Sequence, residues 1–238
     1  MQNSTAPSFA KRSPWFYVPS LYFQQGLPVI IVQQASVVFY KNMGVSNDQI
    51  GLLTSLIAWP WILKMLWAPA VEFYRTRRFW VLLTQAIVTL SLAAAAFMTD
   101  SPHFLITTLA VFTLTAFASA THDTALDGYY MLALAPARQA FFVGIRSSAF
   151  RLAMLFANGV LVMLAGYWAV TGGSVTRGWR MSLLVGAGLY GILFLYAFFS
   201  MPSVATDRPV PVAREVKTRR SKEFVEALAS FFRQKHAW

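Results

Sequence analysis

The chain has 238 residues, of which 57% are hydrophobic and only 12% are charged, and it contains no cysteine. An average soluble domain carries about 25% charged residues, so the composition excludes an ordinary soluble protein, and the lack of cysteine excludes disulfides and cysteine-based metal sites. The net charge of +11 lies mostly in short turns and in the C-terminal tail, so it indicates membrane orientation and no nucleic-acid partner.

Six long apolar stretches fill most of the chain. A run of 18 or more apolar residues is a candidate membrane span, because about 20 helical residues cross a hydrocarbon core of roughly 30 Å. We therefore predict an all-α, polytopic protein with a six-helix transmembrane domain over residues 15–200, preceded by a cytoplasmic N-terminus of residues 1–14. The expected spans cover about residues 15–40, 49–71, 79–99, 104–135, 138–170 and 181–200.

Polar and helix-breaking residues mark the ends of these spans. Ser46, with Gln49 three residues later, predicts an N-cap for the second span, and Pro136 ends the fourth. A Gly-rich turn at 171–178 precedes the sixth.

The tail, residues 201–238, is predicted to be a cytoplasmic linker with two parts. Residues 201–213 are rich in Pro and Val and indicate an extended segment. Apolar residues at helical spacing predict an amphipathic helix at about 221–236, suited to the membrane surface. A basic tail that only sets topology is an equally good interpretation.

Lys and Arg residues are distributed unequally between the two sides of the predicted bundle. With the N-terminus in the cytoplasm, 14 of the 20 fall on the cytoplasmic side and three on the opposite side. By the positive-inside rule, we expect a multi-pass protein of the cell (inner) membrane with both termini cytoplasmic.

Lys64 is a charge that lipid would reject. It lies eleven residues before Arg75, about 16 Å along a helix from the cytoplasmic turn, and this is farther than its side chain reaches by snorkelling. Charges inside a span are functional by default. A locally paired or snorkelling lysine is the structural alternative.

Four more charges lie inside the fourth and fifth spans. Asp123 and Asp127 are four residues apart and share a helix face. An antiparallel hairpin turning at Pro136 brings Asp127 level with Arg146, and Asp123 level with Arg151. We expect at least one of these ion pairs to form, either to lock the two helices together or to act as a switch.

Other polar residues in the spans are ambiguous. His122 has no second His or Cys at ligand spacing, so we expect no metal site and no cofactor. The first span carries amides near a Gly26-Leu27-Pro28 sequence that should loosen the helix, and Asn158 lies in the fifth span. Such amides either line a substrate cavity or hold helices together. The amides of the first span are Gln24, Gln25, Gln33 and Gln34.

Several short motifs together resemble the muropeptide permease branch of the major facilitator superfamily, which acetyl-CoA transporters share. The resemblance covers residues 15–200. Its motifs are Gly26-Leu27-Pro28, Ile50-Gly51-Leu52, Lys64-Met65-Leu66-Trp67-Ala68-Pro69 with Glu72, Gln85, His122-Asp123, Asp127-Gly128-Tyr129, Gly144-Ile145-Arg146 and Gly178-Trp179-Arg180.

The resemblance implies a cytoplasmic gate between the second and third spans. The superfamily's motif at this place is partly present: Ala68 replaces its first glycine, Glu72 replaces an aspartate, and Phe73 stands where an arginine is common. The gate residues carried over are Glu72, Arg75, Arg77 and Arg78.

The family has twelve spans in two halves, and this chain resembles the N-terminal half. The resemblance leads us to expect a truncated or split product, a fragment, or a half that needs a second six-helix partner. It further implies a proton-coupled symporter that imports a bulky anionic solute such as a muropeptide. The candidate substrate and proton-coupling residues are Lys64, Asp123, Asp127, Arg146, Arg151 and Gln25.

Two other classes of function remain. A membrane scaffold or sensor would use the basic tail to bind anionic lipid or a protein partner. A membrane-embedded enzyme would need a clustered metal or nucleophile site, which the sequence does not supply, so we expect no enzyme activity.

Overall fold

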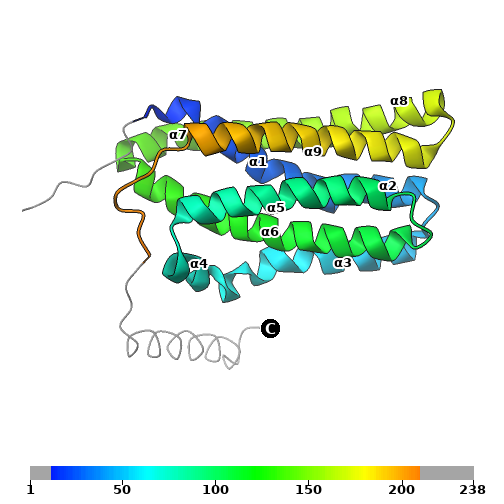
Figure 1. Cartoon of the computed structure of the whole chain (residues 1–238), viewed down its shortest axis with the longest axis horizontal. Coiled ribbons are helices and arrows are strands. Elements are labelled where there is room, and N and C mark those ends of the chain that lie inside the picture. The colour runs from blue at the N-terminus through cyan, green and yellow to red at the C-terminus, as the bar shows by residue number, and fades with distance from the viewer. Residues whose placement is uncertain (1–11, 210–238) are drawn as a thin grey trace, which may run out of the picture.

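A computed structural model of the chain describes residues 12–209, and every regular element in this range is helical. Figure 1 shows long helices that run roughly along one axis and pack side by side. The prediction of an all-α, polytopic fold is confirmed. The amphipathic helix expected at 221–236 lies outside the described residues.

The helices follow one another with short connections. Over the described residues they are η1 (Pro14–Phe16), α1 (Val18–Ile30), η2 (Ile31–Ala35), α2 (Ser36–Asn42), α3 (Asn47–Leu63), η3 (Lys64–Leu66), α4 (Ala68–Tyr74), α5 (Arg77–Met98), α6 (Phe104–Ala133), α7 (Pro136–Leu155), η4 (Phe156–Leu161), α8 (Val162–Gly172) and α9 (Val175–Ser200).

Within the described residues, five helical runs are long and apolar enough to cross a membrane. They are Asn47–Leu66, Arg77–Met98, Phe104–Ala133, Pro136–Gly172 and Val175–Ser200. The run from Val18 to Asn42 is helical throughout but is not among them. It carries the four glutamines, which lower its hydropathy, and its crossing of the membrane stays a prediction.

Side-chain caps start three of the membrane helices, and at the start of α5 the Thr76 hydroxyl accepts a hydrogen bond from the Phe79 N–H at 3.1 Å. The Ser46 hydroxyl accepts a hydrogen bond from the Gln49 backbone N–H, as expected. Ser174 accepts one from the Arg177 N–H, and Gly173 before it has a φ of +65°, which favours glycine. Helix α9 therefore begins at Val175, earlier than the predicted start at 181. The Gly-rich turn expected at 171–178 consists only of Gly173 and Ser174.

Three of the expected spans are not regular helices. The second one changes to 3₁₀ winding at Lys64–Leu66 and then turns at Trp67 before α4 begins. Pro69 has no backbone N–H, so it cannot continue the helical hydrogen-bond ladder back to Met65. The Trp67 indole N–H donates to the Thr121 hydroxyl at 3.1 Å and so ties this break to α6. The first and fifth spans each contain a π-helical segment, η2 and η4.

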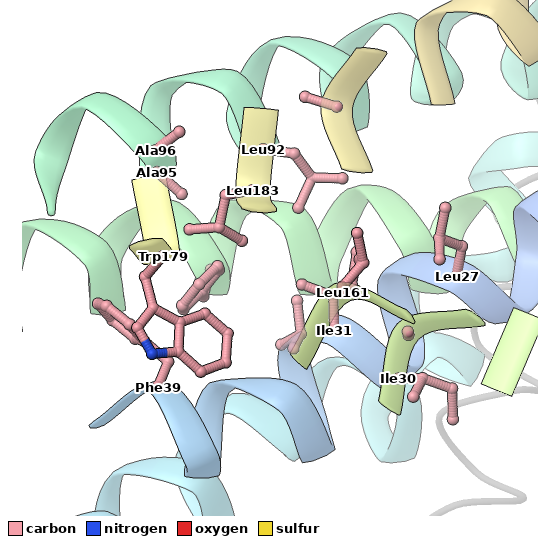
Figure 2. Close-up of a cluster of buried hydrophobic side chains, with 14 of the residues drawn as sticks. Leu27, Ile30, Ile31, Phe39, Leu92, Ala95, Ala96, Leu161, Trp179 and Leu183 are labelled. Carbon is pink, nitrogen blue, oxygen red and sulfur yellow. The ribbon is translucent and has the colours of Figure 1, made fainter. Parts of the chain in front are cut away.

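The main core receives side chains from α1, η2, α2, α3, α5, α6, α7, η4, α8 and α9. Figure 2 shows apolar side chains of α1, η2, α2, α5, η4 and α9 converging, with Leu161 of η4 close to Ile31 and Trp179 beside Phe39. The rings of Phe39 and Trp179 meet edge to face with centroids 5.5 Å apart. Helices α8 and α9 approach very closely at Gly178, where a Cβ would lie 2.3 Å from the Ala165 carbonyl oxygen. Close packing at small residues is typical of helices in lipid.

Candidate functional site

The hairpin of α6 and α7 sets the register of the charged residues. The Gln139 amide donates to the carbonyl oxygens of Met131 and Leu134, at 3.0 and 2.8 Å, which otherwise lack partners at the end of α6. The Tyr130 hydroxyl donates to the Gln139 carbonyl at 2.6 Å. These contacts join the two helices on either side of Pro136, so residues equally far from the turn face each other.

Asp127 and Arg146 form the ion pair expected from this register. Nη2 of Arg146 lies 2.6 Å from Oδ1 of Asp127, and the Tyr22 hydroxyl of α1 donates to the same oxygen at 3.0 Å. The guanidinium also lies over the rings of Tyr22 and Tyr130, at 4.2 and 4.5 Å from their centroids. The prediction that at least one of the two pairs forms is confirmed, and Arg146 is held by three different side chains.

Asp123 pairs with Lys64 and not with Arg151, so only one of the two candidate pairs forms. Its Oδ2 lies 2.8 Å from Nζ of Lys64, and its Oδ1 accepts a hydrogen bond from the Gln25 amide. Lys64 reaches Asp123 because the 3₁₀ segment η3 presents it to α6. Asp123 therefore joins the first, second and fourth expected spans, and Lys64 is a locally paired lysine.

Arg151 instead faces an open pocket of about 560 Å³. Within the described residues it makes no hydrogen bond or ion pair. Gln25 and Arg146 reach the same pocket, so both charged clusters border it. The lining residues are Tyr22, Gln25, Val143, Arg146, Ser147, Phe150, Arg151 and Met154.

His122 lies away from this pocket, in the bundle interior. It is fully buried, and its Nε2 lies 3.3 Å from the Gln85 amide nitrogen. Among residues 12–209, no three His, Cys, Asp or Glu side chains are grouped so as to hold a metal ion.

The four expected gate residues lie where α4 meets α5. Arg77 contacts Glu72 at 3.2 Å. The Arg78 side chain donates to the carbonyl oxygens of Phe198 and Met201, both at 3.0 Å. Arg75 lies over the Phe79 ring, 5.6 Å from its centroid. The basic cluster therefore joins the start of α5 to the end of α9.

Asp207 completes this cluster, and sequence analysis missed it. Its carboxylate accepts hydrogen bonds from the backbone N–H groups of Arg77 and Arg78, at 2.8 and 3.0 Å, and caps the start of α5. The Tyr129 hydroxyl donates to the Pro202 carbonyl at 2.7 Å. The segment after α9 thus folds back along the end of the bundle where α4 meets α5 (Figure 1). No local sequence pattern signals this role, because Asp207 lies 130 residues beyond Arg77 in the chain.

The helical architecture and these clusters can be compared with known proteins. The family model of the Major Facilitator Superfamily matches residues 16–238. The chain belongs to this superfamily. It is therefore a multi-pass membrane protein from a family of transporters.

Several curated relatives are similar to the chain. An anhydromuropeptide permease of Escherichia coli (strain K12) is 26% identical over 224 residues, which are 92% of this chain and 42% of the relative. An uncharacterized protein of Haemophilus influenzae is 32% identical over 192 residues, 79% of this chain and 44% of that protein. The chain thus spans less than half the length of these relatives. The resemblance to the muropeptide permease branch, expected from the motifs, is confirmed.

Proposed function

We propose that the chain forms half of the solute pathway of a secondary active transporter, a proton-coupled importer of a bulky anionic solute such as a muropeptide. The observation that carries this proposal is the pocket of about 560 Å³ that holds Arg151 without a partner in the described residues.

Charge balance supports an anionic solute. Arg146 borders the pocket, but the Asp127 carboxylate neutralises it. Arg151 adds a positive charge that is not balanced there, and an intramembrane guanidinium needs a partner or water. Its planar donors match carboxylate and phosphate groups. Phe150 and Met154 add apolar surface, which suits a solute larger than an inorganic ion.

Asp123 is the proton-coupling residue that we propose. It is ion-paired to Lys64 and hydrogen-bonded to Gln25, and Gln25 also lines the pocket. A proton on Asp123 would remove the charge that holds Lys64. Because the three residues come from three helical runs, this change alters how those runs are held together. Asp127 and Arg146, with Tyr22, brace the pocket wall.

The basic cluster is the gate that we propose. Arg77 and Arg78 contact Glu72, Asp207 and the end of α9 through charged or hydrogen-bonded groups. Such groups exchange partners without exposing apolar surface, so the contact can open and close. Glu72 and Arg75 are the solvent-exposed members of the cluster. In this arrangement the cluster and both chain termini lie on the cytoplasmic side of the inner membrane.

The complete pathway requires a second six-helix half, since the relatives are more than twice as long as the segment they share with this chain. Uptake of a radiolabelled anhydromuropeptide into proteoliposomes tests the proposal, with the chain alone and with a co-expressed second half. We expect uptake that needs both halves, collapses with the proton gradient and is lost in Arg151→Gln. The matched control Arg208→Gln, an exposed arginine outside the spans, should transport normally. Binding of anionic lipid without uptake in either arrangement would favour the scaffold instead.

A further inference from the structure

An amide pair, Gln34 and Asn158, joins the first and fifth helical runs. The Asn158 amide donates to Oε1 of Gln34 at 2.5 Å, and both side chains are exposed. Both residues lie within long helical runs, far from the ends of those runs. Exposed amides at this depth are unfavourable against lipid, because hydrocarbon offers no hydrogen bonds. The pair must therefore face water, a ligand or another part of the transporter.

The pocket and the amide pair share one face of the α7–η4 helix. Ser147, Arg151, Met154 and Asn158 follow one another at spacings of three or four residues, which places them in one stripe. The first three line the pocket. Asn158 is one turn beyond Met154 and about 10 Å along the axis from Arg151. The polar wall of the pocket therefore continues to the amide pair.

The amide pair retains unused hydrogen-bonding capacity. Each primary amide has two donors and a carbonyl acceptor, and their mutual bond uses one donor of Asn158 and the acceptor of Gln34. Within the described residues, neither side chain makes another hydrogen bond. The unused groups are neutral, and they comprise N–H donors as well as a carbonyl acceptor. They can therefore bind hydroxyl and amide groups of a ligand, and they do not favour a second charge.

The backbone at the pair is unusual in the same way on both helices. Gln34 lies in the π-helical segment η2, and Asn158 lies in the π-helical segment η4. π-Helical turns occur frequently at functional sites, where they redirect side chains. Here two π-helical segments are joined by the hydrogen bond between Asn158 and Gln34. This backbone geometry indicates a site independently of the exposed amides.

We propose that Gln34 and Asn158 form a subsite for the neutral hydroxyl and amide groups of a solute whose anionic group binds Arg151. The subsite selects anions that carry such groups about 10 Å from the charge, which is a distance of seven helical residues. This inference rests on the proposed function, because it assumes that an anion occupies the pocket.

The absence of cysteine allows a direct test in the full chain. In Met154→Cys, a membrane-impermeant maleimide reports occupancy between Arg151 and the amide pair. Leu152→Cys is the control, since this exposed residue is turned about 100° from Arg151 around the helix. The probes are N-acetylmuramyl-L-alanine and lactyl-L-alanine, which is the same anion without the sugar. Protection from labelling gives an apparent affinity for each.

We expect the sugar-bearing probe to protect Met154→Cys at concentrations about tenfold lower than lactyl-L-alanine, because its hydroxyl and acetamide groups satisfy the free amides. Gln34→Leu or Asn158→Leu should abolish this preference and leave lactyl-L-alanine binding unchanged. Asn158→Ser, which keeps a hydroxyl, should restore part of it. Arg151→Gln should weaken both probes.

The two proposals fail in different ways. A preference that survives both leucine substitutions, or an equal loss for both probes, means that the pair only holds helices together and overturns the subsite. If Arg151→Gln leaves the binding of both probes unchanged, or if neither probe protects, the anion pocket itself is wrong and the proposed function falls with it.

Discussion

The Lys64 ammonium lies 2.8 Å from the Asp123 carboxylate at the point where the second expected span loses its regular helical winding. The break in the helix therefore positions Lys64 beside the charge of Asp123 inside the membrane. Trp67, three residues later, hydrogen-bonds to Thr121 on the same helix as Asp123. The break and the ion pair are consequently held by a common neighbour, α6.

Removing one partner of this pair should be more harmful than removing both. Lys64→Met leaves the Asp123 charge with only Gln25, and we expect a loss of about 1–3 kcal/mol in the free energy of unfolding. The double variant Lys64→Met with Asp123→Asn should recover most of it, because no charge is left unpaired. Unfolding of the detergent-solubilised chain by denaturant checks both. Simple additivity of the two single effects would contradict a direct interaction.

Asp123→Asn should abolish proton coupling but leave solute movement across the membrane possible. The amide cannot take up and release a proton, so gradient-driven uptake by the paired halves should be abolished. Exchange of labelled for unlabelled solute, which needs no net proton movement, should continue. Uptake that still follows the proton gradient would mean that Asp123 only braces the helices.

Tyr22 should contribute through both its hydroxyl and its ring. Tyr22→Phe removes the bond to Asp127 but keeps the ring under Arg146, so we expect a loss of stability of about 1 kcal/mol. Tyr22→Leu removes both contacts and should cost about 1 kcal/mol more than Tyr22→Phe. Denaturant unfolding measures the two steps. Equal losses in the two variants would show that the ring contact adds nothing.

Asp207 should hold the segment after α9 against the start of α5. Asp207→Ala removes the acceptor for two backbone N–H groups, and we expect a loss of about 1–2 kcal/mol. Hydrogen exchange should become faster at the amides of Arg77 and Arg78. Arg208→Ala, at the exposed neighbouring position, is the control and should exchange normally. Unchanged protection in Asp207→Ala would rule out the cap.

Two glycines of α9 should respond oppositely to the same substitution. Gly178→Ala places a Cβ 2.3 Å from the Ala165 carbonyl oxygen, so α8 and α9 must separate, and we expect a loss of about 2–4 kcal/mol. Gly188→Ala meets nothing within 4 Å and should be neutral or stabilising by up to about 1 kcal/mol. Thermal unfolding compares the pair. Similar midpoints for both variants would contradict the close approach at Gly178.

The sequence predicts most successfully where one short connection determines the geometry. Pro136 locates the turn between α6 and α7, and counting residues outward from it correctly paired Asp127 with Arg146. The same counting placed Asp123 level with Arg151, but Lys64 arrives from a third helix and binds the carboxylate instead. A residue count along one hairpin contains no information on such a competitor.

The remaining errors have related causes. The 3₁₀ break at Lys64 and the π-helical segments at Gln34 and Asn158 do not change the hydropathy of their spans, so an apolar pattern cannot reveal them. Asp207 lies in a segment without helical period, and its role depends on a fold-back of the chain that no local pattern encodes. The early start of α9 depends on the Ser174 cap, which a Gly-rich stretch concealed.

The two π-helical segments also set the rotational phase of everything beyond them. Each inserts one residue into an otherwise α-helical run, and one residue corresponds to about 100° of rotation. Deleting a single residue from Ile31–Ala35 would therefore swing Phe39 away from Trp179 and turn a different flank of α2 toward the bundle. The two insertions lie side by side on the first and fifth helical runs. The packed faces of these two runs therefore stay complementary only while both insertions are present.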